Sequence, residues 1–149
     1  MIRWREATRG DVPAIVALLI DDSLGATRES ADLPLYYAAF DAMQMEWGNE
    51  LIVGETDGKV VATYQLTFIT GLSLRASRRA QVESVRVVSR LRSEGVGGAL
   101  MRDAEMRAVH AGCSMMQLTS NKTRDDAQRF YERAGFEPSH TGFKKMLGE

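Results

Sequence analysis

The chain is poor in thiols and has almost no net charge, and each shortage excludes a class of protein. Its single cysteine, Cys113, cannot form a disulfide within the chain, which excludes a disulfide-stapled fold and favours a reducing compartment. The formal net charge of -1 leaves no excess of basic side chains to displace counterions, so a general nucleic-acid binder is disfavoured. We therefore expect a cytoplasmic protein without nucleic acid among its partners.

Long apolar runs and metal-ligand clusters are also lacking. The longest apolar run covers residues 12–20 and is interrupted by Pro13, which falls far short of the ~20 residues of a membrane span. Residues 1–10 are rich in arginine and contain no apolar stretch, so we expect neither a signal peptide nor a membrane partner. His110 and His140 lie far apart without ligands at useful spacing, so no metal site is expected.

What is present predicts one mixed α/β domain over residues 1–149. Asp57-Gly58 between two β-rich runs is a strong hairpin signal. The unit from Ala80 to Thr119 should be a right-handed, parallel strand–helix–strand crossover that follows an antiparallel first half. Six or seven strands and about four helices are expected in total: strands near 2–6, 51–55, 59–70, 78–88 and 113–119, a last pair within 136–147, and helices near 12–19, 34–47, 96–108 and 127–134.

The turn from Arg92 to Gly97 stands between a predicted strand and a predicted helix. Backbone N–H groups at a helix start are unpaired and carry the positive end of the helix dipole, so they bind phosphate well. Gly95 and Gly97 let the chain approach a diphosphate, and Arg92 adds a charged donor. The dinucleotide fingerprint does not fit, because Leu100 stands at its third glycine, and no Gly-Lys-Ser/Thr loop occurs. The turn alone supports a bound anion and an empty helix start equally.

Two motifs resemble those of the GNAT superfamily of N-acetyltransferases. Arg92-x-x-Gly95-x-Gly97, which follows a valine-rich strand, is similar to the family's phosphate turn. The segment 127–136, read as Ala-x-x-Phe-Tyr-Glu-x-x-Gly-Phe, is complete, and the spacing and element order match along nearly the whole chain. Ser89 and Ser93 replace a frequent Pro and Gly, and Arg124 replaces a frequent Asn, for which Asn121 is a candidate substitute.

The resemblance implies a GNAT-like fold with a splayed parallel strand pair. It also implies acetyl-coenzyme A (acetyl-CoA) as cosubstrate, and direct transfer of its acetyl group, in a ternary complex, to a primary amine of a small molecule or protein. Transfer of another acyl group and a coenzyme A-binding sensor without turnover are the alternatives, and a homodimer is the expected assembly. The residues implied in cofactor binding are Val85, Val87, Val88, Arg92, Ser93, Glu94, Gly95, Val96, Gly97, Gly98, Asn121, Arg124 and Phe130.

Three groups are candidates for the base, the general acid and the oxyanion donor of acetyl transfer. Glu83 resembles a glutamate that many GNAT enzymes use as a base through a water, although an ion pair with Arg79 explains it equally well. Tyr131 resembles the family's general acid, and the alternative is a core aromatic residue. The backbone N–H of Val87 is the expected oxyanion donor.

The acceptor side is expected in residues 21–35 and 71–77. Carboxylates at Asp21, Asp22 and Glu29 are suited to a cationic amine. Tyr36 and Tyr37 are candidate walls of the pocket. A polar loop that only closes the first helix is the alternative.

Overall fold

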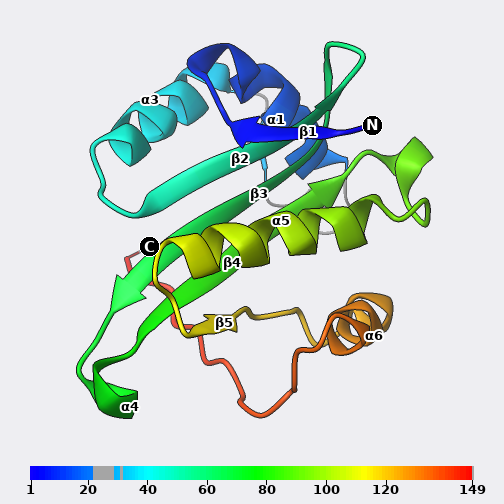
Figure 1. The fold of residues 1–149 in the computed structure, drawn as a ribbon. Helices are drawn as coiled ribbons and strands as arrows, with labels where there is room; N and C mark the ends of the chain where they lie inside the picture. The colour runs from blue at the N-terminus through cyan, green and yellow to red at the C-terminus, as the bar shows by residue number, and fades with distance from the viewer. Residues whose placement is uncertain (22–28, 31, 149) are drawn as a thin grey trace.

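A computed structural model describes residues 1–21, 29–30 and 32–148, and it confirms the expected mixed α/β fold (Figure 1). The described elements are β1 (Arg3–Glu6), η1 (Arg9–Asp11), α1 (Val12–Ile20), α3 (Leu33–Gln44), β2 (Asn49–Thr56), β3 (Lys59–Thr70), α4 (Ser73–Ala76), β4 (Arg78–Val87), η2 (Ser89–Leu91), α5 (Val96–His110), β5 (Met115–Gln117) and α6 (Asp125–Arg133). No helix of the described ranges is long and apolar enough to cross a membrane.

The sheet has five described strands in the order β1-β2-β3-β4-β5. The first four strands pair antiparallel, and β4 pairs with β5 in parallel, as predicted for the crossover through α5. The Asp57-Gly58 hairpin is also confirmed, because both residues have the positive φ angles (52° and 72°) that a tight two-residue hairpin turn requires.

Helices cover both faces of the sheet, so the core has two parts (Figure 1). Leu51 and Ile52 are neighbours on β2, and successive strand side chains point to opposite faces. Ile52 packs under α5 with Leu66 and Leu100, whereas Leu51 packs under α1 and α3 with Phe40.

A buried polar network fixes α5 on its face of the sheet. The Tyr64 hydroxyl donates to the carboxylate of Asp103 at 2.5 Å, and the Nε of Arg107 donates to the same oxygen at 2.8 Å. Burial, together with the nearby Asp103 carboxylate, raises the pKa of Tyr64 well above its ordinary value. The network leaves no charge of this cluster unpaired, as a buried carboxylate requires.

The entry into α1 is held by Thr8 and Asp11. The backbone N–H of Thr8 donates to the Asp11 carboxylate at 2.7 Å. Arg5 from β1 donates to both oxygens of the same carboxylate, at 2.7 and 3.0 Å, and to Glu55 on β2 at 3.1 Å. These contacts tie the start of α1 to the edge of the sheet.

The prediction of six or seven strands was wrong for the described chain, which has five. No described residue after Arg133 belongs to a helix or strand, although a strand pair was expected within 136–147. Phe143, Met146 and Leu147 are 93%, 88% and 89% exposed. The physical reason is the shortness of β5, whose three residues offer little edge on which to build a further strand.

Other boundaries differ by smaller amounts. The helix expected to reach about Trp47 ends at Gln44. The expected 71–77 loop contains α4, a turn in which Leu74, Arg75 and Ala76 all have positive φ. The loop predicted for residues 21–33 lies mostly outside the described residues, as does Asp22.

Candidate active site

The predicted phosphate turn lies between the end of β4 and the first turn of α5. Gly95 is the N-cap of α5 and has a left-handed φ of 83°, and a Cβ placed on it meets nothing within 4 Å. The amides of Val96, Gly97 and Gly98 follow in the first turn, where N–H groups have no acceptor within the helix. The 15-residue helix directs its positive dipole end at this open surface. The turn therefore presents unpaired N–H groups and the positive end of the helix dipole to an open surface.

Gly97 packs closely against the ring of Phe130 on α6. A Cβ at this position would lie 3.2 Å from two ring atoms of Phe130. The missing side chain therefore lets α6 pack closely on α5, which places the ring of Phe130 beside the phosphate turn.

Arg92 is directed away from the turn surface. Its Nε donates to the carbonyl of Val87 at 3.1 Å, and its Nη2 donates to the carbonyl of Asp21 at 2.8 Å. The Ser89 hydroxyl also donates to the Asp21 carboxylate at 3.1 Å. Arg92 thus ties the turn to the end of β4 and to the end of α1, instead of presenting a free guanidinium to a diphosphate.

The parallel pair β4–β5 separates soon after it begins. Only residues 79–81 of β4 pair with β5, opposite residues 115–117, whereas β4 continues to Val87. Gln117 closes the paired region by donating to Gln81 at 2.9 Å. Beyond that point β4 has β3 on one side and no described strand on the other, as Figure 1 shows. The expected splay of the parallel pair is therefore present.

A β-bulge in β4 was not predicted. The register with β3 shifts between Thr63 and Gln65, and Ser84 has a positive φ of 55°. The sequence does carry a signal, because apolar residues alternate through Ala80 and Val82 and then resume one position late at Val85. The bulge exposes Glu83 and Ser84 at the middle of the strand.

Downstream of the bulge, the backbone of β4 faces the gap left by β5. Val88 donates its N–H to the carbonyl of Val61 on β3 at 2.8 Å. Because successive N–H groups of an extended strand point to opposite edges, the N–H of Val87 points to the side from which β5 has diverged. The side chains of Val85 and Val87 are half-buried and pack against the α5 cluster.

Tyr131 lies on α6, facing the same region. Its ring packs edge-to-face on Phe130 and Phe136, at centroid distances of 5.2 and 6.1 Å. Its hydroxyl has no hydrogen-bond partner among the described residues. Burial raises the pKa of Tyr131, although the positive charges of Arg86 and Arg124 act in the opposite direction. The result is a packed ring with a neutral, uncommitted O–H.

Glu83 lies on the opposite face of β4 from α5, across from Gln65 on β3. It is exposed and makes no side-chain hydrogen bond or ion pair with any described residue. The alternative of an ion pair with Arg79 is therefore not seen in the described part of the chain.

The turn before α6 uses Asn121 locally. Its side-chain oxygen accepts hydrogen bonds from the N–H and hydroxyl of Thr123, at 2.9 and 2.6 Å, and its carbonyl accepts from the N–H of Arg124 at 3.0 Å. Arg124 is the N-cap residue of α6. Asn121 thus shapes the approach to α6.

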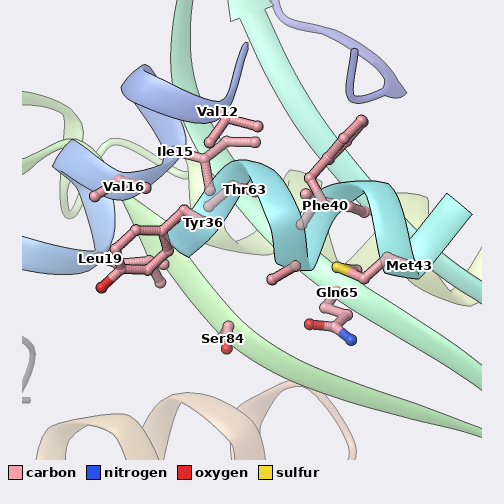
Figure 2. Close-up of a pocket in the computed structure, with 12 residues that line it drawn as sticks. Val12, Ile15, Val16, Leu19, Tyr36, Phe40, Met43, Thr63, Gln65 and Ser84 are labelled. Atoms are coloured by element: carbon pink, nitrogen blue, oxygen red, sulfur yellow. The ribbon is translucent and has the colours of Figure 1, made fainter. Parts of the chain in front are cut away.

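Tyr36 and Tyr37, both expected as walls of the acceptor pocket, lie in different surroundings. Tyr36 lines a cavity beneath α1 and α3 (Figure 2). Tyr37 lies under the guanidinium of Arg9, 4.5 Å from the ring centre, and does not line that cavity. The 71–77 loop is at the far end of β4, about 20 Å from the bulge by strand rise, and none of its residues lines that cavity, so its role on the acceptor side stays a prediction.

Comparison with known proteins agrees with this geometry. The model of the "Acetyltransferase (GNAT) family" matches residues 15–136. The chain is 27% identical over 143 residues to an aminoalkylphosphonate N-acetyltransferase of Salmonella typhimurium, covering 96% of this chain and 90% of that protein. A solved structure described as a transcriptional regulator of Bacillus halodurans C-125 superimposes with a TM-score of 0.94 at 41% identity, covering 99% of this chain and 100% of that one.

A protein of Agrobacterium tumefaciens C58 that is assigned to the acetyltransferases superimposes with a TM-score of 0.87 at 28% identity, covering 97% of this chain and 99% of that one. The family match covers well over half of the chain, and the turn, the splayed strands and the second motif lie within it. The chain therefore belongs to the GNAT family of N-acetyltransferases.

Proposed function

We propose that this enzyme moves the acetyl group of acetyl-CoA directly to a primary amine in a ternary complex, with residues 1–149 working as one domain. The observation that carries the proposal is the meeting of three features: the open first turn of α5, the gap beside β4, and the free O–H of Tyr131. Acetyl-CoA is the cosubstrate that the family typically uses.

The residues present fit that cosubstrate. Within residues 93–98, the N–H groups at the start of α5 and the helix dipole are offered to a diphosphate, whereas the Glu94 N–H donates to the Leu91 carbonyl. Ser93 and Gly95 both have positive φ angles that turn the chain there. The side chains of Val85 and Val87 offer an apolar wall to the pantetheine arm in the gap beside β4, and the N–H of Val87 points to the same gap. Val88, whose N–H is committed to Val61, ends the strand beside them. Phe130, packed against Gly97, closes the side of the turn.

Acetyl-CoA supplies an activated thioester, and the chain's own groups move the protons. Glu83, which is exposed and unpaired among the described residues, accepts a proton from the ammonium through a water, because an alkyl ammonium with pKa near 10 must be deprotonated to attack. The Val87 N–H stabilises negative charge on the carbonyl oxygen. A C–N bond forms, the C–S bond breaks, and the Tyr131 O–H gives its proton to the leaving thiolate. The nitrogen loses its second proton to water as the amide forms, and water returns a proton to Tyr131.

The proposal is tested by following thiol release from acetyl-CoA with a panel of primary amines. Thiol release that depends on an amine, with an acetylated amine as product, is the expected result. A second candidate function, a coenzyme A-binding sensor without turnover, is favoured by the description of the Bacillus halodurans relative as a transcriptional regulator. Tight acetyl-CoA binding without thiol release from any amine would favour the sensor, and release only with longer acyl thioesters would favour another acyl group.

We further propose a homodimer that works in the cytoplasm. The support for the dimer is the sheet edge at β5, together with a C-terminal segment (residues 143–147) whose large apolar side chains, Phe143, Met146 and Leu147, are almost fully exposed. An exposed apolar segment and a free sheet edge are both ready surfaces for a second copy of the chain. The support for the compartment is the lone cysteine, Cys113.

A further inference from the structure

The cavity beneath α1 and α3 is not used by any of the groups that bind acetyl-CoA. It lies between these two helices and the face of β2, β3 and β4 that is opposite α5 (Figure 2). Its volume is about 110 Å³. It is lined by Val12, Ile15, Val16, Leu19, Tyr36, Ala39, Phe40, Met43, Leu51, Thr63, Gln65 and Ser84.

The walls of this cavity are hydrocarbon, and most polar groups in it are already committed. The Thr63 hydroxyl donates to the carbonyl of Ile52 at 2.8 Å, and the Gln65 amide donates to Asn49 at 2.8 Å. The Tyr36 hydroxyl donates to Glu29 at 2.8 Å, so Tyr36 presents its ring. No charged side chain is among the described lining residues. A phosphate or phosphonate group would lose its hydration there without gaining a counter-ion.

One end of the cavity reaches the bulge of β4. Ser84 is the lining residue at that end, and its hydroxyl has no partner among the described residues (Figure 2). Glu83, the proposed base, directly precedes it in the chain and lies across from Gln65, another lining residue. The cavity is therefore apolar along its length and polar at the end beside the base.

We propose that this cavity holds the body of the acceptor, which is a primary amine carrying a compact uncharged hydrocarbon group. The inference rests on the proposed acetyl transfer and adds the class of amine. A dry apolar cavity of roughly 150 Å³ admits benzene, so this one suits a branched or linear chain of about five carbons. The amine nitrogen then lies at the Ser84 end. This acceptor differs from the aminoalkylphosphonate named for the Salmonella relative.

The test compares kcat/KM for a linear series from ethylamine to octylamine with that for ethanolamine and 2-aminoethylphosphonate. We expect a rise of roughly fourfold for each methylene up to about five carbons, followed by a plateau or fall. We also expect pentylamine to exceed 2-aminoethylphosphonate by at least about tenfold. A flat series, or a preference for the phosphonate, would overturn the inference.

Two matched variants locate the effect. Ala39→Phe places a ring in the cavity and should remove most of the gain from ethylamine to pentylamine, while the KM for acetyl-CoA stays the same. Ala38→Phe adds the same ring on the exposed face of α3 and should leave the series unchanged. An equal loss for all amines in Ala39→Phe, or the same loss in Ala38→Phe, would count against the cavity as the binding site.

Binding without turnover separates this inference from the proposed function. Pentylamine titrated by calorimetry onto the enzyme with coenzyme A bound should bind more tightly than ethylamine, and Ala39→Phe should abolish the difference. If this holds while no amine releases thiol, acetyl transfer fails and the cavity assignment stands. If thiol is released but pentylamine has no advantage in either assay, the cavity assignment fails and acetyl transfer stands.

Discussion

At the scale of single residues, the proposed proton donor is the hydroxyl of Tyr131, which does not contribute to the stability of the fold. The Tyr131 O–H has no hydrogen bond to a described residue, so Tyr131→Phe removes only the proton donor. We expect kcat to fall by about 100-fold with the KM for acetyl-CoA little changed, and stability to remain within about 0.5 kcal/mol. Steady-state kinetics and urea unfolding check both parts. An unchanged kcat would contradict the assignment of Tyr131 as general acid.

Glu83 gives a prediction with a pH dependence. Glu83→Gln keeps the shape of an exposed side chain and removes the base, so kcat/KM at pH 7 should fall by about 100-fold. The deficit should shrink as the pH approaches about 10, because the amine then loses its proton without help. A pH profile of kcat/KM for both proteins checks this. A deficit of the same size at every pH would assign Glu83 another role.

The residue scale also shows what the sequence predicts well. The positions of Tyr131 and Gly95 follow from local motifs, and both lie where the resemblance implies. The partners of Arg92 and Gly97 do not follow from local sequence. Arg92 bonds a carbonyl 71 positions away, and Gly97 meets a ring from a separate helix. Such long-range contacts leave no periodic signal in the chain.

At the scale of elements, the packing of α6 on α5 depends on a missing methyl group. In Gly97→Ala the new Cβ would lie 3.2 Å from two atoms of the Phe130 ring, so this packed ring must move aside. We expect a loss of about 1–3 kcal/mol in the free energy of unfolding. Gly98→Ala is the matched control, because its Cβ would meet only the flexible end of Arg102 at 3.4 Å. Equal stability of the two variants in urea unfolding would refute this account.

The start of α1 gives a second prediction at this scale. Asp11→Asn weakens the cap and the pairing with Arg5, and should cost about 1–2 kcal/mol at pH 7. Arg5 lowers the pKa of Asp11, so the stabilisation is present above the unfolded value of about 3.9 and is lost as pH falls below it. Denaturant unfolding at pH 7 and pH 3 checks this.

Asp41→Asn is the control for that cap, because it breaks only the exposed pair with Arg9 and should cost less than about 0.5 kcal/mol at either pH. A cost in Asp11→Asn that is the same at pH 7 and pH 3 would show that the charge of Asp11 is not responsible.

Elements were predicted best where their signals are local. The hairpin at Asp57-Gly58 and the alternation along β3 are visible in a few consecutive residues. The bulge at Ser84 is visible only as a one-residue shift in the alternation of apolar residues along β4. The strands expected within 136–147 needed a partner edge elsewhere in the molecule, and the three residues of β5 do not supply one.

At the scale of the whole molecule, the proposed homodimer gives a prediction. Replacing both Phe143 and Met146 by Glu should convert a dimer into a monomer, because two charges on the exposed segment oppose its burial against a second copy. Light scattering after gel filtration measures the mass directly. Met45→Glu, at an 83% exposed position far from this segment in the chain, is the control and should stay dimeric. A monomeric wild-type protein would refute the proposed dimer.

The hydrogen bonds of Arg92 to the carbonyls of Val87 and Asp21 determine which sequence changes this part of the protein tolerates. Both hydrogen bonds end on main-chain oxygens, and the side-chain contacts of Asp21 are exposed. Substitution at position 21 therefore leaves the main anchor in place, whereas an insertion or deletion between α1 and this carbonyl removes it. Changes in sequence or length after Asp21 leave both of these main-chain acceptors in place. New amine preferences can arise there while the phosphate turn is inherited intact.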